Sequence, residues 1–296
     1  MIRVGTDCSG IEAPIQALKA LKIPFVHKFS CEIDPYCVDS IKANYEPEIL
    51  FEDMNKRKIS DIPDIDLYVC GFPCQPFSMA GNRDGTSDKR GTIFWKCLKV
   101  IKNKLPKVFI LENVKGLLSI SEGKTFENIL KSLKKIKEYD IHWKVLNTRD
   151  YGIPQNRERL FIVGIEKTFP KPFVWPKPKK MKNITEYVDW DDTDEQPLTD
   201  RQKKLMKKIP KNSVFIDTGF IGVTSFPNSD IYSPCLNTRG GLWCVPTHRK
   251  ANIKELLALQ GFPVCFKQEV SDSQMKKQIG NSMSVNVLKE LFKCIF

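Results

Sequence analysis

The sequence has few histidines, no Cys-x-x-Cys pair and no long apolar run. Its 296 residues contain three histidines and ten cysteines, and no two cysteines form a Cys-x-x-Cys pair. This argues against a disulfide scaffold and a structural zinc site. The apolar runs are short, as at positions 108–111, and the N-terminus has no basic-then-apolar leader. We therefore expect reduced thiols, no metal, no membrane span and an intracellular location.

The chain does have enough apolar residues for a core and a large excess of positive charge. Hydrophobic residues make up 41% of the sequence, which supports one large domain or a large domain with a smaller partner. The formal net charge is +12. Such a charge favours a polyanionic partner such as nucleic acid, although a lysine-rich solvated surface is the alternative.

Short apolar runs alternate with amphipathic stretches from the N-terminus to Ile165. This alternation predicts a mostly parallel α/β sheet with strands and connecting helices. The expected strands are at residues 2–4, 25–30, 66–70, 108–111, 142–146 and 160–165, and the expected helices at residues 13–21, 35–44, 94–102 and 126–137. From residue 169 to about residue 200 the composition shifts to proline, lysine and aspartate, which indicates a domain boundary. A last amphipathic helix is expected at residues 285–296.

One octapeptide places a cysteine between two prolines directly after an apolar run. It reads Gly71-Phe72-Pro73-Cys74-Gln75-Pro76-Phe77-Ser78. The prolines prevent a helix, so the chain leaves the strand as a stiff turn, where catalytic groups of α/β sheets are often found. Cys74 is therefore a candidate nucleophile, and a cysteine packed as a small apolar side chain is the alternative.

The first β-α turn suggests a cofactor with a ribose. Gly5 and Gly10 border the turn, and Glu32 follows Gly10 at the end of the second expected strand. An acidic residue at such a spacing can accept hydrogen bonds from ribose hydroxyls. The glycines do not complete a Gly-x-Gly-x-x-Gly loop, so a ligand without a pyrophosphate, such as S-adenosylmethionine, is favoured.

Four further segments complete an ordered set of motifs. They are Glu112-Asn113-Val114, Gln155-Asn156-Arg157-Glu158-Arg159, Leu259-Gln260-Gly261-Phe262-Pro263 and Gln278-Ile279-Gly280-Asn281-Ser282. With the octapeptide, they resemble the cytosine-C5 DNA methyltransferase family over nearly the whole chain. The resemblance implies a Rossmann-like S-adenosylmethionine-dependent sheet and a smaller target-recognition domain. We expect residues 1–168 and 269–296 to form the catalytic domain and residues 169–268 the recognition domain.

The resemblance also implies the catalytic residues. Carbon 5 of cytosine is a poor nucleophile, and addition of a thiolate at carbon 6 activates the ring. Cys74 would form this bond, and Glu112 would hold a proton near ring nitrogen 3. Arg157 and Arg159 would bind the cytosine carbonyl oxygen and the neighbouring backbone. The target base would be flipped out of the duplex first.

For S-adenosylmethionine, the resemblance implies a larger set of residues and a return of the C-terminus. Asp53 would face the adenine and Glu32 the ribose, and the last helix would pack beside the first strand. The full set is Cys8, Ser9, Gly10, Glu32, Ile33, Asp53, Met54, Pro73, Ile93, Asn281 and Ser282.

Three features of the sequence need structural explanation. Residues 77–92 contain three glycines and several basic residues, which fits a lid over phosphate; a disordered surface loop is the alternative. Glu12 stands where many family members have a second glycine, so it either narrows the methionine end of the cofactor site or points into solvent. Asn252 and Ala258 replace a hydroxyl residue and an arginine, so we expect the packing between the domains to differ there.

The favoured function is methylation of cytosine in a specific double-stranded DNA sequence by a monomer. The tRNA-modifying branch of the same family is an alternative, although the Cys-Phe-Thr associated with that branch is missing from the variable region. A catalytically silent DNA-binding homologue is a second alternative. A cysteine hydrolase is a third, and it would pair Cys74 with His142 or His248.

Overall fold

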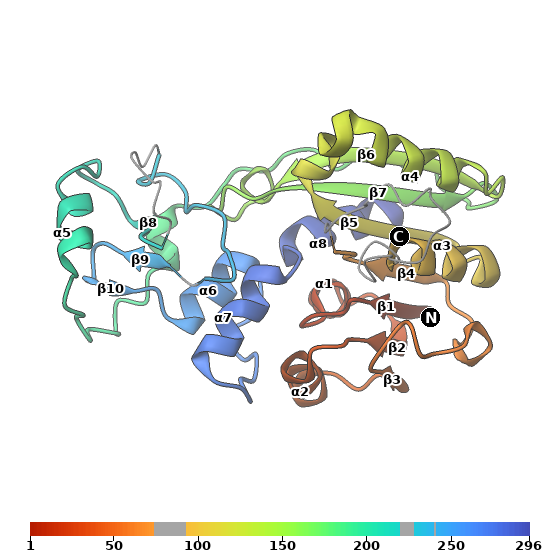
Figure 1. Ribbon diagram of the computed structural model, residues 1–296, viewed down its shortest axis with the longest axis horizontal. Coiled ribbons are helices and arrows are strands. Elements are labelled where there is room, and N and C mark those ends of the chain that lie inside the picture. Colours follow the sequence, from red (N-terminus) through yellow and green to blue (C-terminus); the bar gives the residue numbers. More distant parts are fainter. Residues whose placement is uncertain (74–92, 220–227, 240) are drawn as a thin grey trace.

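A seven-stranded sheet forms the larger part of the computed structural model, which describes residues 1–73, 93–219, 228–239 and 241–296 (Figure 1). The strand order is β3-β2-β1-β4-β5-β7-β6, and all neighbouring pairs are parallel except those of β7, which is antiparallel to β5 and β6. The strands are β1 (Ile2–Asp7), β2 (Phe25–Cys31), β3 (Ile49–Phe51), β4 (Leu67–Cys70), β5 (Val108–Val114), β6 (Tyr139–Asn147) and β7 (Glu158–Glu166).

Helices cover both faces of this sheet, which explains why its central strands are apolar throughout. In β4, Leu67 and Val69 pack in one hydrophobic core, whereas Tyr68 and Cys70 pack in the other. The first core contains residues of α1 (Ala13–Leu21) and α8 (Val285–Ile295), and the second contains residues of α3 (Ile93–Lys104) and α4 (Lys124–Lys134). A strand buried on both faces has no polar alternation, as the sequence of β4 shows.

The chain returns to the large sheet at its C-terminal end. Helix α8 packs against α1, so residues from opposite ends of the sequence share one core. The sequence motifs predicted this return beside the first strand, and in the structure the contact is made by the helix that follows that strand.

A small antiparallel sheet lies at the other end of the molecule (Figure 1). Its order is β10-β9-β8, formed by β8 (Phe215–Asp217), β9 (Leu242–Cys244) and β10 (Arg249–Lys250). Figure 1 shows α5 (Asp200–Met206) beside this sheet, with α6 (Ile253–Gln260) and α7 (Asp272–Asn281) between it and the large sheet. The remaining helix, α2 (Pro35–Asn44), follows β2.

The elements predicted between the N-terminus and Ile165 are all present in the described part of the chain. Helices α1 and α2 have the predicted bounds, and the six predicted strands correspond to β1, β2, β4, β5, β6 and β7. Strand β3 was not predicted, because its three half-buried residues are too few to show a period. The sheet is mostly parallel, as predicted. Strand β7 runs the other way because the connection from β6 is too short for a crossover helix.

Membrane-spanning and metal-binding features are absent from the described ranges. No helix in these ranges has the length and apolar character needed to cross a membrane. The same residues contain no group of three histidine, cysteine or acidic side chains suited to a metal ion. The nine cysteines that the structure describes all have free thiols.

Candidate active site

The carboxyl ends of β1, β2, β4 and β5 meet at one edge of the large sheet. The strand order reverses between β1 and β4, and ligands of open α/β sheets bind at such a point. A cavity of about 400 Å³ opens there. Its lining comes from the first turn, the ends of β2, β4 and β5, the start of β7 and the end of α7, and includes Cys8, Gly10, Glu32, Ile33, Pro73, Glu112, Arg157, Arg159 and Asn281.

The first turn and the end of β2 are joined by one carboxylate. Glu32 Oε2 accepts a hydrogen bond of 2.7 Å from the backbone N–H of Gly10. Glu32 Oε1 accepts 2.9 Å bonds from the N–H groups of Ile33 and Asp34. Burial raises the pKa of Glu32, and these backbone donors oppose that rise. The spacing of Gly10 and Glu32 noted in the sequence therefore corresponds to a direct hydrogen bond. Ile33, the residue after Glu32, lines the cavity and is 72% exposed.

Glu12 differs from both possibilities expected from the sequence. Its side chain neither enters solvent nor lines the cavity, because it is completely buried behind the first turn. Its Oε1 accepts hydrogen bonds from Thr6 Oγ1 and Ser30 Oγ. The expectation that Glu12 narrows the cofactor space is therefore wrong: the carboxylate is directed between β1 and β2.

A buried ion pair that was not predicted lies at the end of β1. Asp7 Oδ2 accepts 2.5 Å hydrogen bonds from Arg57 Nη2 and from the hydroxyl of Tyr68. Both side chains of the ion pair are buried. Asp7 also lines a smaller cavity beside the first turn, together with Ser9, Asn281 and Ser282 among others. The position of Asp7 directly before the turn could have indicated its role from the sequence. Nothing in the sequence indicated that Arg57 is its partner.

Glu112 and Arg159 form an ion pair across two strands. Glu112 is paired with Phe161 in the β5–β7 register, so Arg159, two residues away, lies on the same face. The Glu112 Oε1 to Arg159 Nε distance is 3.3 Å. Burial raises the pKa of Glu112, and the positive charges of Arg159 and Arg157 partly counteract this effect. Glu112 therefore provides a carboxyl group that retains its proton more readily than usual. Arg159 provides the hydrogen-bond donors of its guanidinium group beside it.

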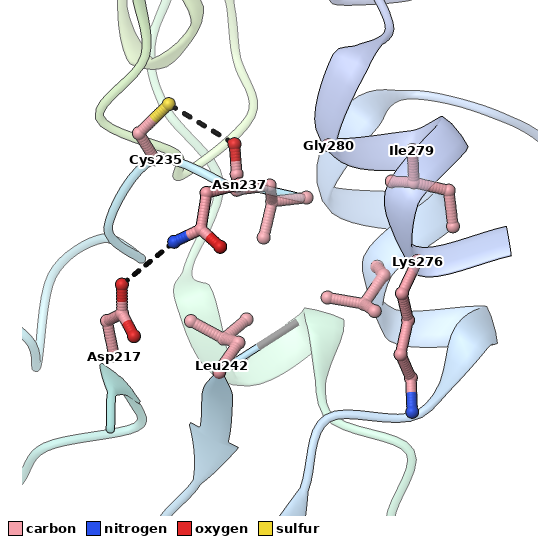
Figure 2. Close-up of a pocket in the computed structure, with 10 residues that line it drawn as sticks. Asp217, Cys235, Asn237, Leu242, Lys276, Ile279 and Gly280 are labelled. Carbon is pink, nitrogen blue, oxygen red and sulfur yellow. Dashed lines mark hydrogen bonds between the residues drawn. The ribbon is translucent and has the colours of Figure 1, made fainter. Parts of the chain in front are cut away.

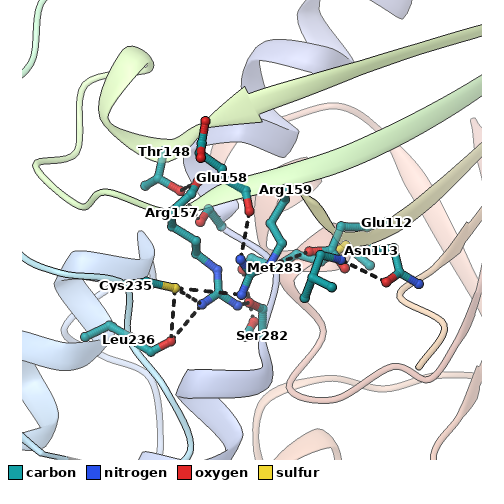
Figure 3. A network of polar contacts seen from close by, with 12 residues as sticks. Glu112, Asn113, Thr148, Arg157, Glu158, Arg159, Cys235, Leu236, Ser282 and Met283 are labelled. Carbon is teal, nitrogen blue, oxygen red and sulfur yellow. Dashed lines mark hydrogen bonds and ion pairs between the residues drawn. The ribbon is translucent and has the colours of Figure 1, made fainter. Parts of the chain in front are cut away.

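Arg157 lies in a buried network of backbone contacts that was not predicted from the sequence. Its side chain is buried, and its guanidinium donates to three backbone carbonyl oxygens: Leu236 at 2.9 Å, Gly280 at 3.0 Å and Ser282 at 2.7 Å (Figure 3). These contacts occupy Nη1 and Nη2, whereas Nε has no hydrogen-bond partner in the described residues. Arg157 thus ties β7 to the segment before β9 and to the end of α7, and its contact with the substrate stays a prediction.

Other motif residues join the same region through buried amides. Gln155 Nε2 donates to the carbonyl of Leu259 and to Gln260 Oε1, both at 2.8 Å. Gln260 Nε2 in turn donates to the carbonyl of Ser282 at 2.6 Å. Three motifs that are separate in the sequence thus meet behind the cavity. Gln155 and Gln260 hold them together through hydrogen bonds.

The remaining predicted residues have different positions. Asp53, Met54 and Ile93 are described, but they line neither of the two cavities at the sheet edge. Asp53 Oδ1 accepts from the backbone and side chain of Asn55, and Met54 is buried in a core. Cys74 and the expected lid at residues 77–92 lie outside the described residues.

Two residues next to the Glu112–Arg159 pair were not predicted to have a role. Asn113 Nδ2 donates to the carbonyl of Phe72 at 2.8 Å and so fixes the turn that follows β4 to β5. Cys235 Sγ lies 3.4 Å from Arg157 Nη1 and 3.8 Å from Arg159 Nη2 (Figure 3). Asn113 belongs to the motif in which Glu112 was recognised as the candidate catalytic residue. Nothing in the sequence indicated a role for Cys235.

Comparison with known proteins identifies the group to which this site belongs. The model of the C-5 cytosine-specific DNA methylase family matches residues 7–228 and 228–296. Type II methyltransferase M.NgoBI of Neisseria gonorrhoeae is 40% identical over 273 residues, which cover 88% of this chain and 83% of the relative. Type II methyltransferase M.HaeII of Haemophilus aegyptius is 38% identical over 277 residues, covering 89% and 83%.

Solved structures share the fold. A putative DNA modification methyltransferase encoded in an E. coli prophage superposes with a TM-score of 0.74 at 19% identity, covering 99% of this chain and 98% of that one. A mutant of DNMT2 from Spodoptera frugiperda superposes with a TM-score of 0.78 at 17% identity and full coverage of both chains. The methyltransferase fold expected from the motifs is confirmed. The chain therefore belongs to the C-5 cytosine-specific DNA methylase family.

Proposed function

We propose that this DNA cytosine-5 methyltransferase transfers a methyl group from S-adenosylmethionine to a flipped cytosine in a specific duplex sequence, through a covalent adduct with Cys74. The observation that carries this proposal is the cavity of about 400 Å³ at the sheet edge. The first turn borders it on one side and the Glu112–Arg159 pair on the other. A donor and an acceptor of the methyl group would thus meet in one space.

The residues around the cavity fit S-adenosylmethionine. The volume lies within the range of small-molecule sites, and Glu32 has a carboxylate at the rim with lone pairs suited to ribose hydroxyls. The exposed side chain of Ile33 offers an apolar surface for a base. When bound, S-adenosylmethionine would supply an electrophilic methyl group. In this proposal Cys8, Ser9, Gly10, Pro73, Asn281 and Ser282 complete its site, and Asp53, Met54 and Ile93 contribute from outside the two cavities.

Glu112 would act at ring nitrogen 3 of the cytosine. Addition of a thiolate at carbon 6 places electron density on this nitrogen, which a carboxyl proton can stabilise. The raised pKa of the buried Glu112 carboxyl favours this protonated state. Arg159 remains close enough to Glu112 to orient it and has a partly exposed side chain to reach the base. Arg157 would act by positioning the strand that carries Arg159.

Cys74 would be the nucleophile, as its motif and the family indicate. A free thiol has a pKa near 8.5, so about 3% of it is thiolate at pH 7. A nearby cation would increase this fraction, and we propose that Arg159 contributes. The proton on carbon 5 must leave before Cys74 departs, and we assign that step to water.

The region from residue 169 to 268 would read the DNA sequence. It contains the small sheet and a cluster of lysines between residues 167 and 211. Lysines bind phosphates, whereas sequence is read by side chains in the grooves. Flipping a cytosine costs a few kcal/mol, which contacts with the phosphate backbone would offset. The two-domain division at these residues is part of the proposal.

The direct experiment is covalent trapping with a modified duplex. Mapping of methylated cytosines in DNA from cells that express the chain would first give the target sequence. A duplex with 5-fluorocytosine at that position cannot lose its carbon-5 substituent as a proton, so the adduct should accumulate. We expect a denaturation-resistant complex with the wild type and none with Cys74→Ser.

Matched substrates separate the alternatives. A methyl-transfer assay with unmodified tRNA should give no methyl incorporation, and transfer to tRNA alone would assign the chain to the tRNA-modifying branch. Binding of duplex DNA without methylation or trapping would assign it to a silent homologue. An adduct of full yield with Cys74→Ser would reject Cys74 as the nucleophile.

A further inference from the structure

A chain of hydrogen bonds is buried beneath the first turn, and of its members only Ser9 has been assigned to the cofactor site above. Its centre is Glu12, whose side chain is completely buried. Glu12 Oε1 accepts from Thr6 Oγ1 at 2.5 Å and from Ser30 Oγ at 2.6 Å. Thr6 belongs to β1 and Ser30 to β2. One carboxylate oxygen therefore joins the two strands whose ends flank the turn.

The directions of these bonds follow from the number of hydrogens. A hydroxyl has one hydrogen, and a carboxylate has none. Thr6 and Ser30 both donate their hydrogen to Glu12, so each hydroxyl oxygen must accept its other short contact. Ser9 Oγ, 2.7 Å from Thr6 Oγ1, is then the donor to Thr6, and His27 Nε2, 2.9 Å from Ser30 Oγ, is the donor to Ser30. Glu12 thus sets the direction of every bond from His27 to Ser9.

Ser9 is the end of this chain of bonds that reaches the turn. With its hydrogen directed to Thr6, Ser9 Oγ accepts a 3.0 Å bond from the backbone N–H of Cys31. Its longer contacts, 3.2 Å to the Thr6 carbonyl and 3.3 Å to the Cys31 carbonyl, are weaker alternatives for the same hydrogen. The backbone N–H of Ser9 also donates to the Cys31 carbonyl, at 3.2 Å. Ser9 is therefore fixed to the end of β2, directly before Glu32.

The turn has a conformation that requires such support. Cys8 and Glu12 have positive φ angles of 50° and 57°, in the left-handed region. This conformation is unfavourable for residues with a Cβ, and it persists where surrounding contacts fix it. A glycine at position 12 would avoid the strain but would supply no carboxylate.

The burial of Glu12 is itself unfavourable for stability. Its second oxygen, Oε2, has no hydrogen-bond partner in the described part of the chain, and neither has Nδ1 of His27. A buried polar atom without a partner carries the full cost of its desolvation. Two unfavourable contributions, backbone strain and the desolvation of Oε2, thus stand against the hydrogen bonds of Oε1 and its 3.5 Å contact with His27 Nε2, which favours a role in function.

We propose that Glu12 is a positioning residue for S-adenosylmethionine. Acting through Thr6 and Ser30, its buried carboxylate holds Ser9, and with it the first turn, in the arrangement that binds the cofactor. This inference rests on the proposed function, because it assumes that the turn binds S-adenosylmethionine. It extends that function to a residue that touches no part of the cavity.

Calorimetric titration of the full chain with S-adenosylmethionine tests this role with three substitutions. Glu12→Leu removes the acceptor, Glu12→Gln keeps one acceptor oxygen, and Glu12→Gly removes both the carboxylate and the backbone strain. We expect Leu and Gly to raise Kd about tenfold, whereas Gln stays within about threefold of the wild type. With saturating cofactor and DNA, kcat should stay within about twofold for all three. Glu48→Gln, whose side chain is 48% exposed, is the matched control.

Four results would overturn the inference. These are wild-type affinity in Glu12→Leu, wild-type affinity in Glu12→Gly, equal losses in Gln and Leu, and a fall of kcat without a change of Kd. If Glu12→Leu does not fold, Thr6→Val removes the link between Glu12 and Ser9 while Ser30 keeps its bond, and it should raise Kd similarly. A wild-type chain that binds no S-adenosylmethionine would contradict the proposed function itself.

Discussion

Glu112 is a carboxyl group whose surroundings favour its proton, which distinguishes it from an ordinary surface glutamate. Burial is the larger effect on its pKa and raises it, and the nearby arginines reduce the rise. A raised pKa means that the folded state binds the proton more tightly than the unfolded state does. The free energy of unfolding therefore falls as pH rises from the ordinary pKa of the carboxyl to its raised value. This cost in stability is acceptable where the proton is used in the reaction.

We predict that Glu112→Gln reduces the methylation rate by about 10² to 10⁴, the usual contribution of a general acid. The substitution removes the ionisable group, so the thermal stability should be unchanged or slightly higher at neutral pH. Initial rates with tritiated S-adenosylmethionine and a thermal unfolding curve measure both quantities. Cofactor affinity serves as the control, and a tenfold loss of affinity would show that Glu112 acts mainly through cofactor binding.

Arg157 and Arg159 are two positions apart in one motif, but they have opposite surroundings. We predict that Arg157→Lys lowers the free energy of unfolding by about 3 kcal/mol, because one ammonium cannot satisfy three buried carbonyl oxygens. Arg159→Lys, with its partly exposed side chain, should lose activity with little change in stability. Chemical denaturation of both variants gives the comparison. Equal free energies of unfolding for the two variants would contradict the structural role assigned to the carbonyl contacts of Arg157.

The sequence motifs predicted well which residues lie near the site. They predicted less well which atoms each of these residues contacts. Glu112 and Arg159 could be recognised because they stand in motifs that resemble those of the family, whereas their ion pair depends on the β5–β7 register. The burial of Arg157 could not, since its carbonyl partners are 79 to 125 residues away in sequence. Glu12 was recognised as a departure from the pattern, but its partners in β1 and β2 depend on the packing of the two strands.

Among the secondary-structure elements, α7 makes an unusually close contact with the segment before β9. A pocket at this contact is lined by Asp217, Cys235, Leu242, Lys276 and others (Figure 2). At its border, a Cβ added to Gly280 would lie 2.5 Å from the carbonyl carbon of Asn237. Backbone atoms cannot move aside as a flexible side chain can. Gly280 therefore sets the distance between the helix and the segment.

We predict that Gly280→Ala destabilises the protein by about 1–3 kcal/mol through overpacking. It should also weaken DNA methylation, because the displaced segment provides the Leu236 carbonyl that Arg157 binds. Thermal unfolding and methylation rates test both effects. Gly116→Ala is the control, since the nearest atom to its Cβ would be 3.9 Å away. Similar losses in the two variants would indicate a general effect of replacing glycine.

The helices and strands around the cofactor turn were predictable from hydrophobic patterns, whereas the small sheet was not. Strands β8, β9 and β10 have three, three and two residues, too short to show a period of two. Helix α6 begins at a side-chain cap instead: Asn252 Oδ1 accepts from the N–H of Glu255. Asn252 also donates to Asp189 and Asp192, so the departure noted in the sequence has a structural role between α6 and the acidic stretch before α5.

For the molecule as a whole, charge should determine how DNA binding responds to salt. The net charge is +12, and lysines and arginines that bind phosphate release counterions. If about six phosphates are bound, DNA affinity should fall by about 10³ between 50 and 200 mM salt. Affinity for S-adenosylmethionine should change little over that range. Fluorescence anisotropy of labelled duplex and calorimetry measure the two; a flat response for DNA would contradict a phosphate-dominated interface.

The packing of α8 against α1 has a consequence for synthesis of the protein. During translation, the strands of the large sheet, with Glu32 and Glu112, leave the ribosome long before Asn281, Ser282 and α8 do. The cavity wall and one core remain incomplete until the last helix is available, and contacts over such a sequence separation form late. A ribosome-bound chain that ends before residue 281 should therefore lack methylation activity. Methylation would thus begin only after α8 has been synthesised.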